Sequence, residues 1–485
     1  MGSISVAICR DAARNATPIV LRMMKNLNHR GSDAFGVASP KELVLSEKIS
    51  ELEEANLRSP ISMAYGLMRI FPKDIPQPVK AREYVIAFDG RIYPSTSPDV
   101  EQAQRRIGEG DPLQGLRNLI EAGDGAYAIA MLRNSEVFLA RDPIGLKPLY
   151  YGESEEFVAA ASERKALWDI GIREVTTFPL GHIARATASG FSFDKIQSLV
   201  QPPIKQVDMD TAVRQLKELL LASLSARTKD VEKVAVPFSG GVDSSVIALL
   251  AKLAGLEVKL ISVGMEGQSE LEHARRSAEE LGLPLTISRF TPADLEEAVG
   301  EVLWHIEEPN LLKFSVAFPI YLAARAASRG GFKVLLAGQG SDELFGGYRR
   351  FLKPLAEGSP EKALEEIFRS VAQSHTVNYE RDEKASIPHK VELRLPYADW
   401  KTIQYSLSLP LGLKIASPSD LLRKRVLRKL AETLGIPKSM SERPKKAIQY
   451  ATGVSKALKN LAKKNGLDST QYLERRFNEV FYSKG

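Results

Sequence analysis

The sequence predicts two domains of different fold class, an α+β sandwich of antiparallel sheets followed by an α/β domain with a parallel sheet. Its 485 residues are too many for one ordinary hydrophobic core. Short apolar runs separated by turns fill the first part, whereas strands alternate with helices later in the chain. We therefore expect domains at residues 1–197 and 208–485, joined by the proline-containing segment 198–208.

The expected elements of the first domain are short strands. The runs at 84–88, 126–131, 136–140 and 149–152 have the length and spacing of strands in packed antiparallel sheets. The single cysteine, Cys9, lies in an apolar run, where packing in the core is its expected role. One cysteine excludes an internal disulfide and is typical of a reducing compartment, so we expect a cytoplasmic protein.

The second domain begins with an amphipathic helix pattern at 210–226. Apolar runs and helix patterns then alternate at 233–238, 244–254, 258–263, 269–282, 285–288 and 332–337, the last after a helix that ends near 328. This alternation predicts a parallel sheet covered by helices on both faces, with a ligand at the carboxyl ends of the strands. Residues beyond about 350 are predicted to be mainly helical and to complete that site.

Composition argues against two classes of partner. No apolar run approaches the roughly 18 residues that span a bilayer, so no membrane is expected. The formal net charge of +6 is a mild excess, and the basic clusters at 424–429 and 443–446 lack interleaved aromatic residues. We interpret those clusters as solvated helix faces plus an anion site, and we expect no nucleic acid.

A glycine-rich turn stands where the run at 233–238 ends and the next helix begins. It comprises Ser239-Gly240-Gly241-Val242-Asp243-Ser244-Ser245. The glycines let the backbone approach an anion, and the hydroxyl groups and helix N-terminal amides can donate to phosphate oxygens. Asp243 would repel phosphate unless a cation lay between them, so the pattern implies Mg²⁺. The turn lacks the Gly-Lys-Ser/Thr ending of a Walker loop.

A second glycine-rich loop follows the run at 332–337. It reads Gly338-Gln339-Gly340-Ser341-Asp342-Glu343-Leu344-Phe345-Gly346-Gly347-Tyr348. Because strand-end loops can converge at one edge of a sheet, Asp342 can join Asp243 in holding one metal ion. The alternative is a pair of unrelated structural turns.

These loops carry a resemblance to a known family. The first resembles the pyrophosphate loop of ATP pyrophosphatases, which split ATP between its α and β phosphates. Together with the second loop and the segments 391–397 and 443–453, it resembles the synthase domain of asparagine synthetases, in family order. The resemblance implies ATP as substrate and a ligase that adenylates aspartate to aspartyl-AMP, uses ammonia and releases AMP and pyrophosphate.

The resemblance also implies roles for individual residues. Residues 239–245 would hold the pyrophosphate, with Asp243 and Asp342 sharing Mg²⁺, and the loop residues Gly338, Gly340 and Ser341 beside them. Val263 and Gly264 match the strand end next to adenine, and Lys445 matches a lysine that stabilises charge on the phosphates and the tetrahedral intermediate. Many family members have Glu where Gln339 stands, and an amide cannot act as a base.

Residues 1 to about 190 resemble the family's glutaminase domain, which has the N-terminal-nucleophile-hydrolase fold. The segments 29–37 and 141–150 carry this resemblance. Gly2 stands in place of the nucleophilic cysteine, and Asp89 replaces an asparagine that donates to the oxyanion. The arginine that clamps glutamine aligns near Leu67, so we expect glutaminase activity to be lost.

Three functions remain open. The first is asparagine synthesis from aspartate and ammonia by a possible homodimer. The second resembles β-lactam synthetase, or another amide ligase that adenylates a different carboxylate. The third is a catalytically silent ATP-binding regulatory protein, against which the intact loop and Lys445 argue.

Overall fold

The computed structural model describes residues 1–482 except 82, 109 and 124. The chain forms two compact units, Met1–Leu199 and Val200–Gly485. Between β13 (Gly190–Lys195) and α6 (Met209–Thr228) the chain has no helix or strand.

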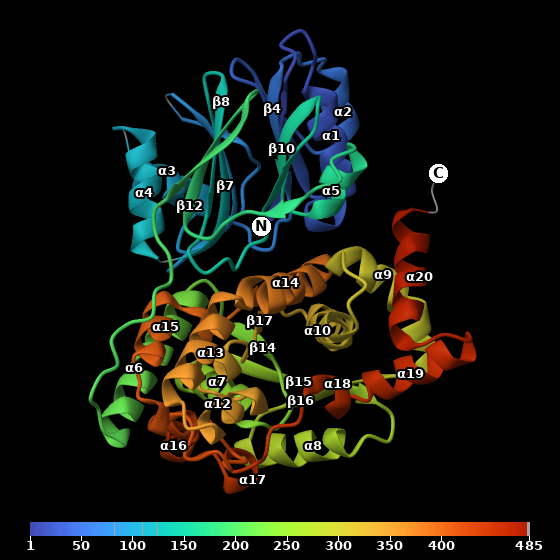
Figure 1. Cartoon of the computed structure of the whole chain (residues 1–485). Coiled ribbons are helices and arrows are strands. Elements are labelled where there is room, and N and C mark those ends of the chain that lie inside the picture. The colour runs from blue at the N-terminus through green and yellow to red at the C-terminus, as the bar shows by residue number, and fades with distance from the viewer. Residues whose placement is uncertain (82, 109, 124, 483–485) are drawn as a thin grey trace. The chain divides into compact units, whose positions relative to one another are not determined.

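The first unit consists of two antiparallel sheets with helices on the outside (Figure 1). One sheet has the order β11–β9–β10–β1–β4–β2–β3, and the other has the order β13–β12–β8–β7–β6–β5. Apolar side chains fill the space between the sheets, and two further clusters lie under α1 (Thr17–Asn26) and α5 (Arg164–Asp169) and under α3 (Asp99–Ile107) and α4 (Pro112–Ala122). The predicted sandwich is therefore confirmed.

The central strands of this unit are apolar on both faces, because each sheet packs against the other sheet on one face and against helices on the other. In β1 (Gly2–Cys9) every residue is buried, and Cys9 packs in the core as expected. The first sheet contains β1, β2 (Ala34–Ala38), β3 (Leu43–Ser46), β4 (Ile61–Leu67), β9 (Tyr150–Glu153), β10 (Phe157–Ala161) and β11 (Thr176–Thr177). The second contains β5 (Val79–Lys80), β6 (Val85–Ile92), β7 (Gly125–Arg133), β8 (Glu136–Arg141), β12 (His182–Thr187) and β13.

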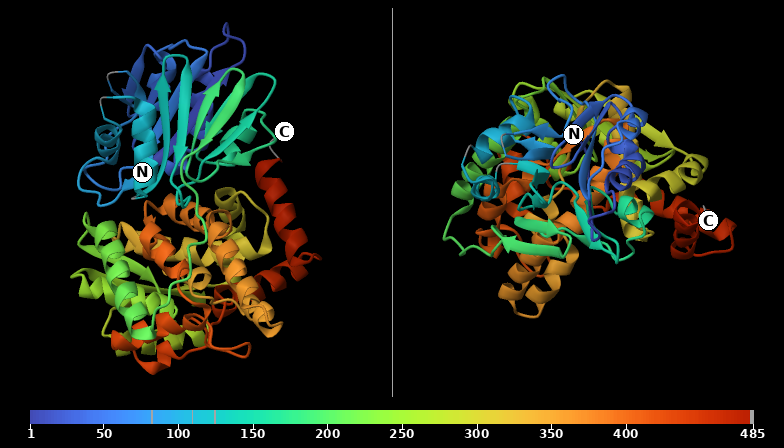
Figure 2. Two further views of the ribbon diagram at one scale, coloured as in Figure 1. Left: turned by 60° about the vertical axis from the view of Figure 1, so that its left-hand side comes forward. Right: turned by 90° about the horizontal axis from the view of Figure 1, so that it is seen from above.

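The second unit contains a five-stranded parallel sheet in the order β16–β15–β14–β17–β18, with helices on both faces (Figures 1 and 2). Its strands are β14 (Lys233–Pro237), β15 (Glu257–Met265), β16 (Leu285–Phe290), β17 (Val334–Leu336) and β18 (Glu392–Arg394). Strand β18 lies inside the region that we predicted as mainly helical; it is only three residues long and pairs with β17. The α/β class is confirmed.

Most helices of this unit match the sequence expectation. The helices between strands are α7 (Val242–Leu253), α8 (Ser269–Leu281), α9 (Pro292–Ile306) and α10 (Leu311–Arg329), and α9 starts with a capping box of Thr291 and Asp294. Later helices include α11 (Ser341–Leu344), α13 (Pro360–Ala372), α14 (Glu380–Ser386), α16 (Arg425–Thr433), α18 (Ile448–Ala451), α19 (Val454–Lys464) and α20 (Ser469–Phe481).

Among the described residues, α10 is long and apolar enough by length and composition to cross a membrane, and 61% of its apolar window is buried inside the protein. It packs against α9, α14 and β15, which is typical of the core helix of an α/β domain.

Candidate functional site

A cavity of about 660 Å³ opens at the carboxyl ends of the parallel strands. Of the residues predicted from sequence, eight line it: Ser239, Asp243, Ser244, Val263, Gly338, Gln339, Asp342 and Lys445. Six lie outside its lining: Gly240, Gly241, Ser245, Gly264, Gly340 and Ser341. The two glycine-rich loops therefore converge on one cavity, although part of each loop only shapes it.

The first loop presents backbone groups to the cavity. Gly240 has a φ of +67°, which favours glycine, and α7 starts at Val242 without a side-chain cap on its first turn. The hydroxyl groups of Ser244 and Ser245 donate to the Gly241 carbonyl, at 3.3 and 2.9 Å. The N–H groups of this helix terminus are thus the main anion donors that the loop offers.

The two predicted metal ligands lie together, with a lysine between them. Lys424 Nζ lies 2.6 and 2.7 Å from the two carboxylate oxygens of Asp243. It also lies 2.6 Å from Asp342 Oδ1, as an ion pair without hydrogen-bond geometry, and 3.3 Å from Ser341 Oγ. The two carboxylates thus point to a common centre, and their sharing of a metal ion stays a prediction.

Sequence reasoning missed the role of Lys424. The prediction for 424–429 and 443–446 was solvated helix faces plus an anion site. The solvated part is wrong for Lys424, whose side chain is only 2% exposed, and for Arg428, which is buried as well. The only sequence signal for Lys424 was that its basic run precedes the segment 443–453, which the resemblance assigns to the site.

Arg428 joins the two segments that carry the lysines. Its guanidinium donates to the carbonyl groups of Leu422 and Arg423, at 2.7 and 2.8 Å, and to those of Ser441 and Arg443. Because an arginine presents several donors in a fixed plane, these bonds hold the start of α16 against the chain that leads to Lys445.

Lys445 forms an ion pair with Asp342 Oδ2 and lies 4.6 Å from the centre of the Tyr348 ring. Burial lowers the pKa of Lys445 to about 8, against the opposing attraction of Asp243. Burial would raise the pKa of Asp243, but the attraction of Lys424 and Lys445 outweighs it and the pKa is lowered. The site therefore holds ionised carboxylates facing ammonium groups.

A further carboxylate, Glu343, lines the cavity close to Gln339 in sequence. It accepts hydrogen bonds from the Tyr348 hydroxyl, at 2.5 Å, and from Asn378 Nδ2, at 2.8 Å. Its Oε2 is buried and has no hydrogen-bond partner among the residues that the structure describes. Other carboxylates in this lining, such as Glu270, Glu366 and Asp382, are paired with arginine or lysine.

The first unit has its own buried polar centre around Gly2. The Gly2 N–H donates to Asp89 Oδ1 at 2.9 Å, and Arg30 donates to Asp89 Oδ2 at 3.2 Å. A Cβ atom on Gly2 would lie 2.2 Å from the Gly66 carbonyl oxygen and 2.5 Å from the Tyr65 ring. A side chain therefore does not fit at position 2, where the resemblance places a cysteine.

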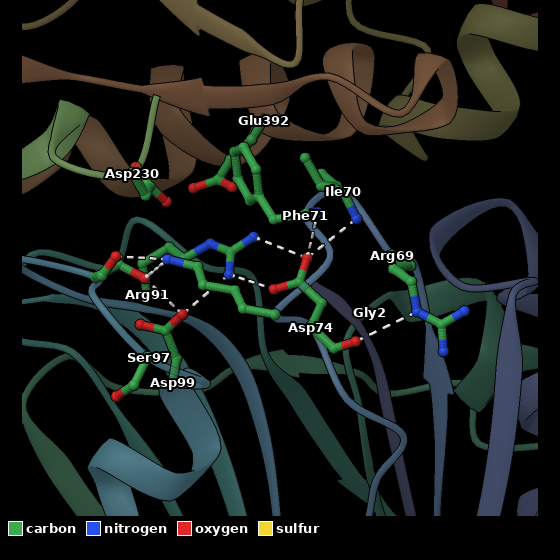
Figure 3. Close-up of polar contacts among 12 residues, drawn as sticks. Gly2, Arg69, Ile70, Phe71, Asp74, Arg91, Ser97, Asp99, Asp230 and Glu392 are labelled. Carbon is green, nitrogen blue, oxygen red and sulfur yellow. Dashed lines mark hydrogen bonds and ion pairs between the residues drawn. The ribbon is translucent and has the colours of Figure 1, made fainter. Parts of the chain in front are cut away.

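A second buried cluster lies nearby in the same unit (Figure 3). The Arg91 guanidinium donates to Asp74, at 2.6 and 3.2 Å, and to Asp99 at 2.9 Å. Leu67 is buried in β4 opposite Gly2, and the next arginine, Arg69, donates its N–H to Asp33 at 2.9 Å. The resemblance places the glutamine-clamping arginine near Leu67, and Arg69 follows two residues later.

Both units match families of known proteins. A family described as asparagine synthase matches residues 215–366 and 356–483, and one described as glutamine amidotransferase domain matches residues 68–169. A protein of Methanocaldococcus jannaschii named putative asparagine synthetase [glutamine-hydrolyzing] 1 is 31% identical, over 99% of this chain and 98% of its own length. The asparagine synthetase [glutamine-hydrolyzing] of Asparagus officinalis is 27% identical, over 94% of this chain and 78% of its own.

Proposed function

Because the chain belongs to the asparagine synthetase family, we propose that it makes asparagine from aspartate, ATP and ammonia. In this reaction the aspartate side-chain carboxylate is adenylated, pyrophosphate leaves, and ammonia displaces AMP. A carboxylate is unreactive until it carries a good leaving group, and AMP supplies one. The substrates are small molecules; a homodimer, a cytoplasmic location and the absence of nucleic acid and membrane partners stay predictions.

One observation carries the proposal. Three charged residues from distant segments of the chain line the cavity beside the N-terminus of α7: Asp243, Asp342 and Lys445. Helix N-terminal amides and ammonium groups bind phosphate, and cleavage of ATP builds up negative charge at its phosphates.

Mg²⁺ fits the donor set that the aspartates provide. Both carboxylates reach one point, because Lys424 Nζ contacts both. The described residues offer no group of three or more His, Cys, Asp or Glu side chains for a metal, and Mg²⁺ in nucleotide sites commonly takes one or two carboxylates plus phosphate oxygens. When bound there, the ion would neutralise phosphate charge.

The protein's own side chains then have separable tasks. Lys445 would donate to the phosphates and to the developing negative charge of the tetrahedral intermediate. Val263 lines the same cavity and would contact the adenine. Gln339 lines the cavity and can orient the acceptor through its amide, but it cannot take a proton.

We assign the general base to Glu343. The Glu343 side chain lines the cavity, and its buried Oε2 has no hydrogen-bond partner among the described residues, whereas the other acids considered above each have a cationic partner. Ammonia that attacks the acyl adenylate must lose a proton, and a positioned carboxylate typically contributes about 10²–10⁴-fold to such a step. Glu343→Gln should lower the rate of amide formation but spare the adenylation step, which isotope exchange between pyrophosphate and ATP would measure.

We also propose that ammonia, and not glutamine, supplies the nitrogen. At position 2 there is no nucleophile, and the space beside its backbone is occupied by Gly66 and Tyr65. Asp89 is already bonded to the Gly2 N–H and Arg30, so it does not offer an oxyanion donor.

Product analysis tests both proposals. The protein is incubated with ATP, Mg²⁺ and aspartate, and with either ¹⁵N-ammonium or amide-¹⁵N-glutamine. We expect labelled asparagine, AMP and pyrophosphate with ammonium and none with glutamine. ADP in stoichiometry with the amide would refute the pyrophosphatase assignment, whereas glutamate release from glutamine would refute only the loss of glutaminase.

A further inference from the structure

All four carboxylate oxygens of the aspartate pair are in contact with ammonium groups. Lys424 takes both oxygens of Asp243 and one of Asp342, and Lys445 takes the remaining oxygen of Asp342. These are the same oxygens that a metal ion would need. Two negative and two positive charges face each other, so the cluster is neutral by itself.

Lys424 is held firmly in this position. Arg423 and Lys424 have φ values of +51° and +53°, and two consecutive non-glycine residues in this region are unusual. Strained backbone of this kind is found at functional sites, where the surroundings enforce it. Arg428 supplies part of that restraint through its bond to the Arg423 carbonyl.

Close packing at Gly347 also confines the lysine. A Cβ atom there would lie 2.3 Å from Lys424 Cε and 2.0 Å from Asp342 Oδ1. The chain therefore uses a glycine to bring Lys424 and Asp342 together. A lysine that only balanced surface charge would need neither the left-handed backbone at 423 and 424 nor the close packing against Gly347.

We propose that Lys424 is a built-in counter-ion of the aspartate pair that makes Mg²⁺ binding conditional on nucleotide. The proposal deepens the proposed function and rests on it. A divalent ion that entered alone would meet oxygens already neutralised and would leave excess positive charge in a buried site. The phosphates of ATP supply acceptors for the displaced ammonium groups, so metal and nucleotide bind together. By linkage, the metal increases nucleotide affinity by the same factor.

The test measures metal binding and needs no turnover. Protein-bound Mn²⁺ is measured by equilibrium dialysis of the full chain against MnCl₂, alone or with saturating inorganic pyrophosphate on both sides of the membrane, so that metal chelated by free pyrophosphate is subtracted. We expect the wild type to bind Mn²⁺ at least about tenfold more tightly with pyrophosphate than without it. We expect Lys424→Met to bind Mn²⁺ alone at least about tenfold more tightly than the wild type does.

Lys446→Met is the matched control, because it removes the same charge from the cavity lining at a lysine paired with Glu270, away from the aspartates. It should behave as wild type when Mn²⁺ is added alone. If Lys424→Met does not fold, Lys424→Gln serves the same comparison. Equal Mn²⁺ affinity with and without pyrophosphate in the wild type, or no gain in either Lys424 variant, overturns the counter-ion proposal. A wild type that binds neither pyrophosphate nor ATP with metal would instead overturn the proposed function.

Discussion

Replacement of Arg91 by methionine should strongly destabilise the first unit. The Arg91 side chain is 1% exposed, and the Asp74 and Asp99 side chains that it binds are each 4% exposed. Methionine preserves much of the apolar volume but removes the cation that Asp74 and Asp99 share, and Asp74 keeps only the attraction of the N-terminal ammonium. Breaking a buried ion pair in this way typically costs about 3–5 kcal/mol.

We expect the destabilisation to lie at the lower end of this range, because both carboxylates keep hydrogen bonds from backbone N–H groups. Asp74 still accepts from the N–H groups of Ile70 and Phe71, and Asp99 accepts from the Ile92 N–H. We therefore expect a loss of about 3 kcal/mol, which for a unit of this size lowers Tm by about 6–12 °C.

Differential scanning calorimetry of the full chain measures this change. Arg105→Met is the control, since Arg105 lies on α3 with a side chain that is 61% exposed and contacts Glu101 at 3.7 Å. That variant should stay within about 0.5 kcal/mol of the wild type. A Tm for Arg91→Met that matches the Arg105→Met value would show that the buried cluster does not hold the unit together.

Three further predictions concern other sites. Gly2→Cys should release no glutamate from glutamine and should cost about 1–3 kcal/mol by overpacking against Gly66; glutamate release in a coupled assay would contradict it. Asp342→Asn should reduce ATP–pyrophosphate exchange at least about 100-fold, and near-normal exchange would remove Asp342 from the site. Burial, helped by repulsion from His305, lowers the pKa of His389 from 6.5 to about 4. The stability held by its neutral ring is therefore complete above pH 6.5 and is lost as the pH falls toward 4, on the order of 3 kcal/mol in all. In His389→Phe the free energy of unfolding, measured with denaturant, should depend less on pH between 6.5 and 4. The same pH dependence as in the wild type would refute this prediction.

The fold class was predictable because hydrophobic period and turn residues are local signals. The runs at 126–131 and 258–263 became β7 and β15, each longer by one residue at its start and two at its end. Strand β18 was not predictable, because three residues are too few to show an alternating hydrophobic pattern. Its strand conformation depends on pairing with β17.

From strand geometry alone, the site was predictable only where its residues lie in strand-end loops, whereas Val263 and Lys445 were predicted from the family resemblance. Asp243 and Asp342 follow strands, so their convergence follows from the geometry of a parallel sheet. Lys424 begins a helix in a left-handed conformation, and only tertiary packing brings it to the aspartates. Nothing in its local sequence distinguishes it from the exposed lysine at 429.

The order of the site residues along the chain has a consequence for biosynthesis. The phosphate loop is made by residue 245, yet Lys424, Arg428 and Lys445 are synthesised some two hundred residues later. Until they emerge from the ribosome, the Asp243 and Asp342 carboxylates face each other without the ammonium groups that neutralise them. A nascent chain that ends before residue 424 can neutralise these carboxylates only with a divalent cation, which is the binding that Lys424 suppresses in the finished protein.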